Sequence, residues 1–294
     1  MLWIIYPIVA AFLWAIIEIV DRHIIKDEIR DPWVCTSFFG FTCYILFAIL
    51  AVFTGDIFSV SLRIIFLLML GGIIAACATI FYYIALQREK ISKLAPLFPT
   101  NVIWIVILSY FILKERLLYI QYVGILILLL GVVLIAFKKG TKYKINFAAA
   151  LILLSTLIWS FRDLFIKLSS NLGNYHIFDI LFWVFLGYFI VSTIIFIIHH
   201  PKIIEKSKKG IEYIILNSLL CFIAYLVYVF AISKYLLSLV SSVAAITPLL
   251  VFLIVFLLTK LNSKLIYEKY DKYDLITNFI ATILVVIGVI LIYI

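Results

Sequence analysis

The sequence predicts an all-α integral membrane protein, with ten transmembrane helices arranged as two inverted five-helix repeats. Three observations predict this fold class. Hydrophobic residues make up 67% of the chain and charged residues only 13%, whereas soluble domains are about half apolar and about a quarter charged. The apolar residues gather in runs long enough to cross a bilayer. The two halves, residues 1–140 and 141–294, also share short patterns in the same order.

A helix that crosses a bilayer needs about 20 mostly apolar residues. The first such run begins almost at the N-terminus, has no basic residue before it and is long for a signal peptide, so we expect a retained first helix. The connections between runs are too short for a soluble domain. In chain order the predicted spans are 2–20, 33–53, 62–86, 94–113, 117–137, 147–168, 177–198, 212–232, 236–259 and 273–294.

Internal similarity divides these spans into two sets of five. "LWAIIEIVDR" in the first span and "IWSFRDLFIK" in the sixth both place a tryptophan, an acid and a base four residues apart. "FYYIAL" in the third span matches "VYVFAI" in the eighth, and "GVVLI" in the fifth matches "GVILI" in the tenth. The first pattern consists of Trp14, Glu18 and Arg22 in one half and Trp159, Asp163 and Lys167 in the other.

An odd number of helices per repeat has a topological consequence. A five-helix unit ends on the side opposite its start, so the second copy must enter the membrane inverted. Inverted repeats related by an axis in the membrane plane are a common plan of secondary transporters, with the binding site near the midplane between the halves.

The net charge of +9 reflects basic loops rather than a nucleic-acid surface. Most of the 24 lysines and arginines lie in the loops that follow odd-numbered spans. The positive-inside rule places such loops in the cytoplasm, so both termini are expected outside. We therefore expect a multi-pass protein of the cell membrane, without a nucleic-acid partner.

The segment "ISKLAPLFPTNVIWIVILSYFILKERLLYIQYVGILILLLGVVLI" (91–135) contains a charged turn, Leu113-Lys114-Glu115-Arg116-Leu117, followed by Gly124 and Gly131 in the next span. It resembles the end of the EamA domain, a five-helix unit that usually occurs in tandem in the drug/metabolite transporter superfamily. With the ten spans, the resemblance covers nearly the whole chain.

Two features depart from the family pattern. The second half reads "LLTKLNSKLIYEKYDKYD" where the turn is expected, and Glu268-Lys269 is its candidate counterpart. Many relatives are described with cytoplasmic termini, whereas the loop charges here favour termini outside.

The resemblance implies a secondary active transporter that moves a small polar metabolite, an amino acid or a related solute, by alternating access, with export favoured. Its partners would be that solute, membrane lipid and a coupling proton or cation, and no cofactor or metal is expected. One alternative is an integral membrane enzyme acting on lipid-linked or small amphipathic substrates, which would usually show clustered carboxylates or histidines. Another is a pore or a structural subunit, and a pore needs a continuous polar lining.

Two acids within spans, Glu18 and Asp163, are the foremost candidate site residues. An ionisable side chain in a span costs about 2.5–3.5 kcal/mol on insertion scales, so it usually faces a cavity or a partner. Each acid either lines the transport path or neutralises the base four residues later, Arg22 or Lys167. Arg162 lies about 100° from Asp163 on the helical wheel and could bind an anionic substrate or extend outward to water.

Aromatic and polar residues in other spans complete the candidate site. Tyr82, Tyr83, Tyr225 and Tyr228 suit either a cavity wall or an interfacial belt. Pro99 and Pro248 favour helix breaks beside polar residues. The predicted cavity-lining set is Trp14, Glu18, Tyr82, Asn101, Trp159, Arg162, Asp163, Tyr225, Tyr228 and Thr247.

Other features have structural interpretations. Glu115 and Arg116 are expected to cap a helix and fix a tight turn. The spacings Gly71/Ala75 and Gly72/Ala76 are typical of close helix packing. The four cysteines are expected to be small buried apolar residues.

Overall fold

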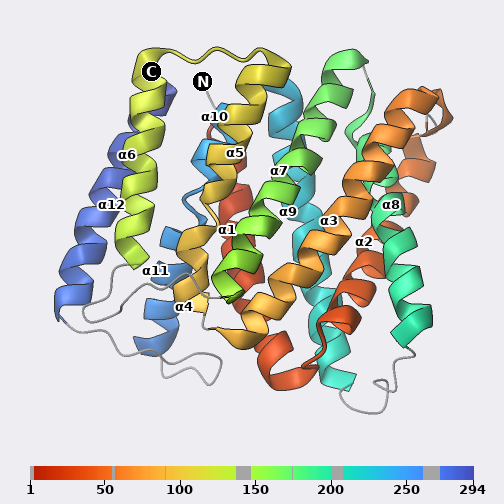
Figure 1. The fold of residues 1–294 in the computed structure, drawn as a ribbon, viewed down its shortest axis with the longest axis horizontal. Coiled ribbons are helices and arrows are strands. Elements are labelled where there is room, and N and C mark those ends of the chain that lie inside the picture. The colour runs from red at the N-terminus through yellow and green to blue at the C-terminus, as the bar shows by residue number, and fades with distance from the viewer. Residues whose placement is uncertain are drawn as a thin grey trace.

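The computed structural model describes residues 3–54, 57–89, 91–136, 147–173, 175–199, 208–260 and 272–294. These residues form one bundle of helices that run between two ends (Figure 1). Helices satisfy their own backbone hydrogen bonds, as a bilayer requires. No strand occurs in the described ranges, so the all-α prediction is confirmed there.

Each of the ten predicted segments is mainly helical over its described residues. The helices are α1 (Ile5–His23), α2 (Pro32–Thr54), α3 (Leu62–Arg88), α4 (Ile91–Leu94), α5 (Thr100–Leu108), α6 (Tyr119–Ala136), α7 (Phe147–Leu172), α8 (Ile177–His199), α9 (Lys208–Lys234), α10 (Leu237–Ala244), α11 (Thr247–Lys260) and α12 (Lys272–Tyr293). Short 3₁₀ and π segments, Ile24–Glu28, Ile57–Ser59, Ala95–Leu97 and Ser109–Leu113, extend or join them.

Six helical stretches are long and apolar enough to cross a membrane, judged by length and composition over the described residues. They are 32–53, 62–88, 147–172, 177–199, 208–234 and 237–260. Shorter apolar helices cover 100–113, 119–134 and 279–293. The chain is thus a multi-pass membrane protein, and the count of ten crossings stays a prediction.

Two of the predicted spans are interrupted helices. The span 236–259 divides into α10 and α11, which are separated at residues 245 and 246. Pro248 lies in the first turn of α11, where a proline needs no hydrogen-bond partner for its nitrogen. The span 94–113 has a similar break, with Pro99 as the N-cap of α5. The prolines therefore mark both breaks, as the sequence favoured.

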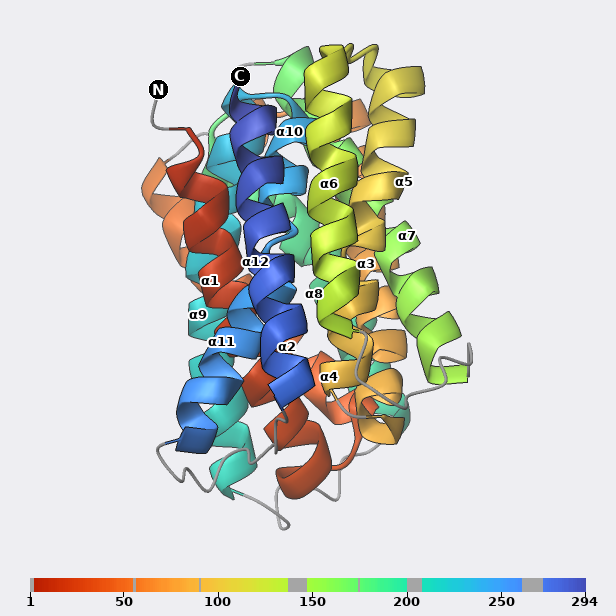
Figure 2. The same ribbon diagram turned by 90° about the vertical axis from the view of Figure 1, so that its left-hand side faces the viewer.

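Helices from the two halves of the chain pack against one another throughout the bundle. α3 contacts α7 and α8, α1 contacts α9 and α11, α2 contacts α8, and α6 contacts α12. The start of α1 and the end of α12 lie at the same end of the bundle (Figures 1 and 2).

Small residues allow the closest of these approaches. A Cβ added to Gly72 would lie 1.8 Å from the Val184 carbonyl oxygen of α8, whereas one added to Gly71 would meet nothing nearer than 3.4 Å. The close packing expected of these glycines therefore occurs mainly at Gly72.

Cys77 is exposed, so the expectation that all four cysteines are buried is wrong for this residue. A small apolar side chain suits the lipid-facing side of a helix equally well.

Candidate functional site

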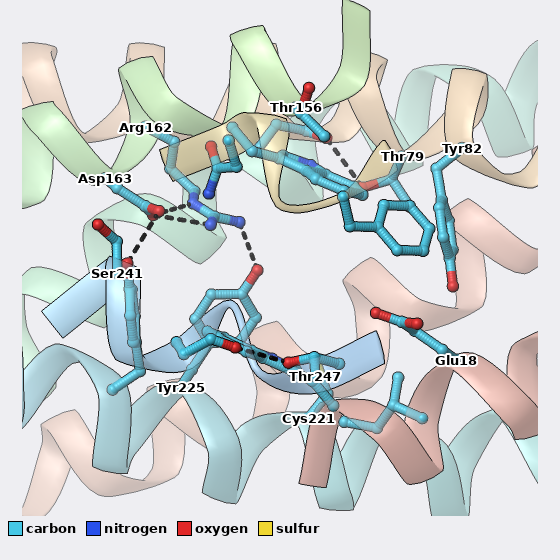
Figure 3. A pocket seen from close by; sticks show the side chains of 18 of the residues that line it. Glu18, Thr79, Tyr82, Thr156, Arg162, Asp163, Cys221, Tyr225, Ser241 and Thr247 are labelled. Carbon is cyan, nitrogen blue, oxygen red and sulfur yellow. Dashed lines mark hydrogen bonds and ion pairs between the residues drawn. The ribbon is translucent and has the colours of Figure 1, made fainter. Parts of the chain in front are cut away.

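A cavity with a volume of about 190 Å³ lies within the bundle, lined by side chains from both halves of the chain (Figure 3). Its lining comes from α1, α2, α3, α5, α7, α8, α9 and the interrupted pair α10 and α11. All ten side chains predicted from the sequence line this one cavity: Trp14, Glu18, Tyr82, Asn101, Trp159, Arg162, Asp163, Tyr225, Tyr228 and Thr247. Their role in binding is a separate proposal.

The helix interruptions place two of these residues. Asn101 follows the break at Pro99 and lies in the first turn of α5. Thr247 begins α11, and its hydroxyl donates to the Ala244 carbonyl, 2.8 Å away, across the break. Each break thus brings a polar side chain and an irregular stretch of backbone to the cavity, where backbone groups freed from a helix are tolerated.

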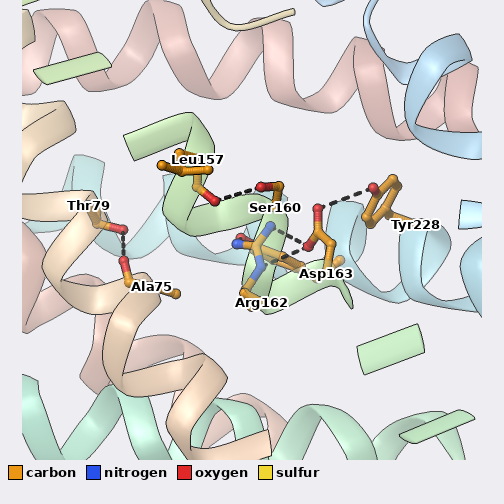
Figure 4. A network of polar contacts seen from close by, with 8 residues as sticks. Ala75, Thr79, Leu157, Ser160, Arg162, Asp163 and Tyr228 are labelled. Atoms are coloured by element: carbon orange, nitrogen blue, oxygen red, sulfur yellow. Dashed lines mark hydrogen bonds and ion pairs between the residues drawn. The ribbon is translucent and has the colours of Figure 1, made fainter. Parts of the chain in front are cut away.

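An ion pair on α7 forms one side of the cavity. Arg162 donates from Nε (2.9 Å) and from Nη2 (2.7 Å) to Oδ1 of Asp163. The second carboxylate oxygen accepts from the Tyr228 hydroxyl at 3.3 Å (Figure 4). Both charged side chains are buried, at 7% and 2% exposure. A buried charge needs such compensation because an uncompensated one costs several kcal/mol.

Arg162 is also held by an aromatic neighbour. Its Nη1 donates to the Tyr225 hydroxyl, and its guanidinium carbon lies 5.0 Å from the centre of that ring. The side chain therefore lines the cavity and does not extend outward to water. It also pairs with Asp163, despite the 100° separation on the helical wheel, because the arginine side chain is long enough for Nε and Nη2 to reach Oδ1.

A second acidic group lies across the cavity, on the last turns of α1. Asp21 accepts hydrogen bonds from the Tyr82 hydroxyl (3.1 Å), the Tyr83 hydroxyl (2.9 Å) and Asn217 Nδ2 (2.8 Å). Glu18, one turn earlier, points its carboxylate into the open centre of the cavity (Figure 3). Its buried Oε2 has no hydrogen-bond partner among the described residues.

The bases do not pair with the acids four residues before them. Arg22 donates to the Leu86 carbonyl at the end of α3. Lys167 donates to the Ile232 carbonyl (2.8 Å) and the Tyr235 carbonyl (2.9 Å) near the end of α9. Of the two alternatives for these acids, neutralisation of the base four residues later does not match these contacts, because carbonyls at helix ends attract the cations instead.

Aromatic rings form much of the remaining wall. Trp14 contacts Tyr228, with 4.9 Å between ring centres, and Tyr225, with 6.3 Å. Trp159 contacts Tyr82 at 5.5 Å. Rings at these separations provide apolar surfaces that also attract cations.

Several polar residues around the cavity were not among those predicted from the sequence. Asp21 carried a usable signal, because a residue three positions after Glu18 lies on the same helical face. Asn217 had none, because its partner lies in a helix distant in sequence. Thr79, Tyr188 and Ser241 also line the cavity. Within the described ranges, no three His, Cys, Asp or Glu side chains come close enough to hold a metal.

Comparisons with known proteins agree with this architecture. Residues 1–137 match the family model described as "EamA-like transporter family". No curated protein matches the chain significantly. A solved structure, described as "Crystal structure of protein", aligns over 98% of this chain and 95% of its own, with a TM-score of 0.72 and 16% identity. At that identity the likeness establishes a shared fold alone.

The family match includes the charged turn Leu113–Leu117 and the helix that follows it, α6. Residues 1–137 thus match the EamA-like transporter family, which belongs to the drug/metabolite transporter superfamily.

Proposed function

We propose that the protein is a secondary active transporter that moves a small polar metabolite across the cell membrane by alternating access. One observation carries the proposal: a single cavity is lined by both halves of the chain, with charged groups on two opposite sides. Its volume of about 190 Å³ lies below the 300–1,000 Å³ typical of drug-sized ligand sites, which favours a small solute.

Equivalent contacts in the two halves support the proposed five-helix repeats, 1–140 and 141–294. Arg22 and Lys167 occupy the same place in the matched patterns. Each donates to the carbonyl of a residue that ends a matched motif, Leu86 in "FYYIAL" and Ile232 in "VYVFAI". A contact repeated within both halves is stronger support for duplication than apolar similarity.

The pairing of helices supports an inverted arrangement. α2 with α8 and α6 with α12 are corresponding helices of the two repeats, and each pair packs together. α3 packs on α7, and α9, the counterpart of α3, packs on α1. A two-fold axis between the halves produces this pattern. The halves would rock about the cavity so that it opens to each side in turn.

The proposal extends to the transported solute and to the direction of transport. An amino acid or a related solute, moved outward, is the class that the family resemblance favours. Glu18 and Asp163 would take part in the cycle by binding the solute or a coupling proton or cation. No contact among the described residues favours the alternative of a lipid-directed enzyme.

The first experiment is a thermal-shift screen of the purified protein with amino acids, amines, nucleotides and sugar phosphates. A ligand that binds the folded state raises the melting temperature by mass action. The stabilising solute is then used in proteoliposome counterflow, in which unlabelled internal solute drives transient accumulation of labelled external solute. Counterflow is expected for a carrier. Single-channel currents in place of counterflow would refute the proposal.

Matched variants test the acids. Glu18→Gln and Asp163→Asn are each expected to reduce counterflow at least tenfold while the protein stays folded. Glu212→Gln, an equal change at an exposed position on α9, is the control. If both cavity variants transport like the unmodified protein, the acids have no role in the cycle.

A further inference from the structure

Buried unpartnered atoms in the cavity lining indicate what a ligand must supply. Three such atoms lack a hydrogen-bond partner: Glu18 Oε2, Asn101 Oδ1 and the Tyr188 hydroxyl oxygen. An amide oxygen and an ionised carboxylate oxygen can only accept, so a ligand that satisfies Asn101 Oδ1 and Glu18 Oε2 must donate.

The charged donor of the cavity is already engaged. Arg162 is the only cation among the lining residues, and it directs Nε and Nη2 to Asp163 and Nη1 to Tyr225. The tyrosine hydroxyls of Tyr228 and Tyr82 also donate to carboxylates of the protein. An anionic group entering the cavity meets a guanidinium whose charge Asp163 compensates.

The three acids that line the cavity, Glu18, Asp21 and Asp163, differ in the partners of their carboxyl groups. Asp163 has Arg162 beside it, and Asp21 has three neutral donors within 3.1 Å. Glu18 Oε2 has no hydrogen-bond partner in the part of the chain that the structure describes. An acid inside a membrane protein normally faces a partner. A cation that enters the cavity would supply the partner that Glu18 lacks.

The surroundings of Glu18 suit an organic cation better than a bare metal ion. Trp14, four residues earlier, lies on the same face of α1, and the Tyr82 and Trp159 rings contact each other beside the cavity. Aromatic faces attract ammonium groups and bury their apolar substituents. A small metal ion would instead need several oxygen ligands gathered around it.

We propose that the cavity selects an organic ammonium ion with N–H donors, a primary or secondary amine whose apolar or aromatic body lies between the rings. Glu18 binds the N–H groups as the specificity-determining residue, and Asn101 accepts a further donor. The inference rests on the proposed function and names the substrate class of the same site. It places amines ahead of zwitterionic amino acids, because the one cation that could take a carboxylate already serves Asp163.

Four ligands that share one aromatic body test this selectivity. They are 2-phenylethylamine, its N,N,N-trimethyl derivative, L-phenylalanine and 3-phenylpropionate, and binding to the full chain in nanodiscs is measured by calorimetry. We expect 2-phenylethylamine to bind at least tenfold more tightly than each of the others. Absence of amine binding, or tighter binding of the zwitterion or the anion, overturns the proposal.

Variants assign the selectivity to Glu18. Glu18→Gln is expected to weaken 2-phenylethylamine binding about 10- to 100-fold, the value of a hydrogen bond to a charged group. Glu212→Gln, exposed on α9, leaves it unchanged. Melting curves establish that both variants fold. Equal amine affinity in Glu18→Gln and the unmodified protein refutes the assignment.

Counterflow separates this inference from the proposed function. Amine binding that depends on Glu18, without counterflow of the amine, contradicts transport and leaves the cavity's selectivity standing. Counterflow of phenylalanine or phenylpropionate, without counterflow of the amine, supports transport and refutes the inference.

Discussion

Replacing Glu115 tests how the two halves of the chain are joined. The Glu115 carboxylate is 7% exposed and lies in the turn between α5 and α6. It accepts from the backbone nitrogens of Leu237 (2.8 Å) and Ser238 (3.1 Å) and from the Ser238 hydroxyl. It therefore caps the N-terminus of α10, the first part of an interrupted helix in the other half. Lys114, with φ of 59°, makes the left-handed turn that presents it.

The contacts set the expected cost of Glu115→Ala. Loss of an N-cap costs about 1 kcal/mol, up to about 2. Removing a negative charge from a partly buried helix N-terminus adds about 0.3–2 kcal/mol. A stranded buried hydroxyl adds about 1 kcal/mol. The sum is about 2–5 kcal/mol, and at about 2–4 °C per kcal/mol the melting temperature should fall by about 5–20 °C. Glu115→Gln keeps one acceptor and should lose about half as much.

Melting of the purified protein in one detergent measures the effect. Arg116→Ala is the matched control, because Arg116 is the exposed neighbour of Glu115 in the same turn. It is expected to melt within about 1 °C of the unmodified protein, since exposed surface changes cost little. If Glu115→Ala melts like Arg116→Ala, the cap does not stabilise α10 and the reasoning fails.

Two further predictions concern packing and the buried ion pair. Gly72→Ala should cost about 1–3 kcal/mol, because its Cβ would lie 1.8 Å from the Val184 carbonyl oxygen. Gly71→Ala, with 3.4 Å to its nearest neighbour, should melt normally, and equal melting temperatures would contradict the close approach. Asp163→Asn should lower the melting temperature by leaving the Arg162 charge uncompensated, whereas the double variant Arg162→Gln/Asp163→Asn should recover stability. A double variant less stable than Asp163→Asn would argue against this pairing.

Much of the fold follows from the sequence, because a bilayer leaves few choices for an apolar chain. Runs of about 20 apolar residues must become helices, since only helices and closed barrels satisfy the backbone in lipid. The prolines added finer detail. Pro248 has no N–H to donate to the carbonyl four residues earlier, that of Ala244, and α10 ends at Ala244. The candidate counterpart of the charged turn, Glu268-Lys269, lies outside the described residues.

The polar contacts were harder to predict because they depend on tertiary structure. Helical spacing paired Arg22 with Glu18, yet the structure gives Arg22 the Leu86 carbonyl, which only folding brings near. Asn217 and Asp21 meet through the packing of α9 on α1, and a single sequence contains no trace of that contact. Positions that face the cavity could be predicted from the sequence, because a polar residue in an apolar span is costly unless it faces a cavity or a partner. The partner of each residue could not be predicted, because it depends on how the helices pack.

Site-directed labelling tests the inverted arrangement most directly. With the four native cysteines replaced by alanine, single cysteines are introduced as Trp3→Cys, before α1, and Phe147→Cys, at the start of α7. A membrane-impermeant maleimide is then applied to sealed right-side-out and inverted vesicles. Labelling from opposite sides is expected, with Trp3→Cys outside and Phe147→Cys in the cytoplasm. Labelling of both positions from one side would mean that an even number of helices separates them, which contradicts the inverted repeats and the carrier built on them.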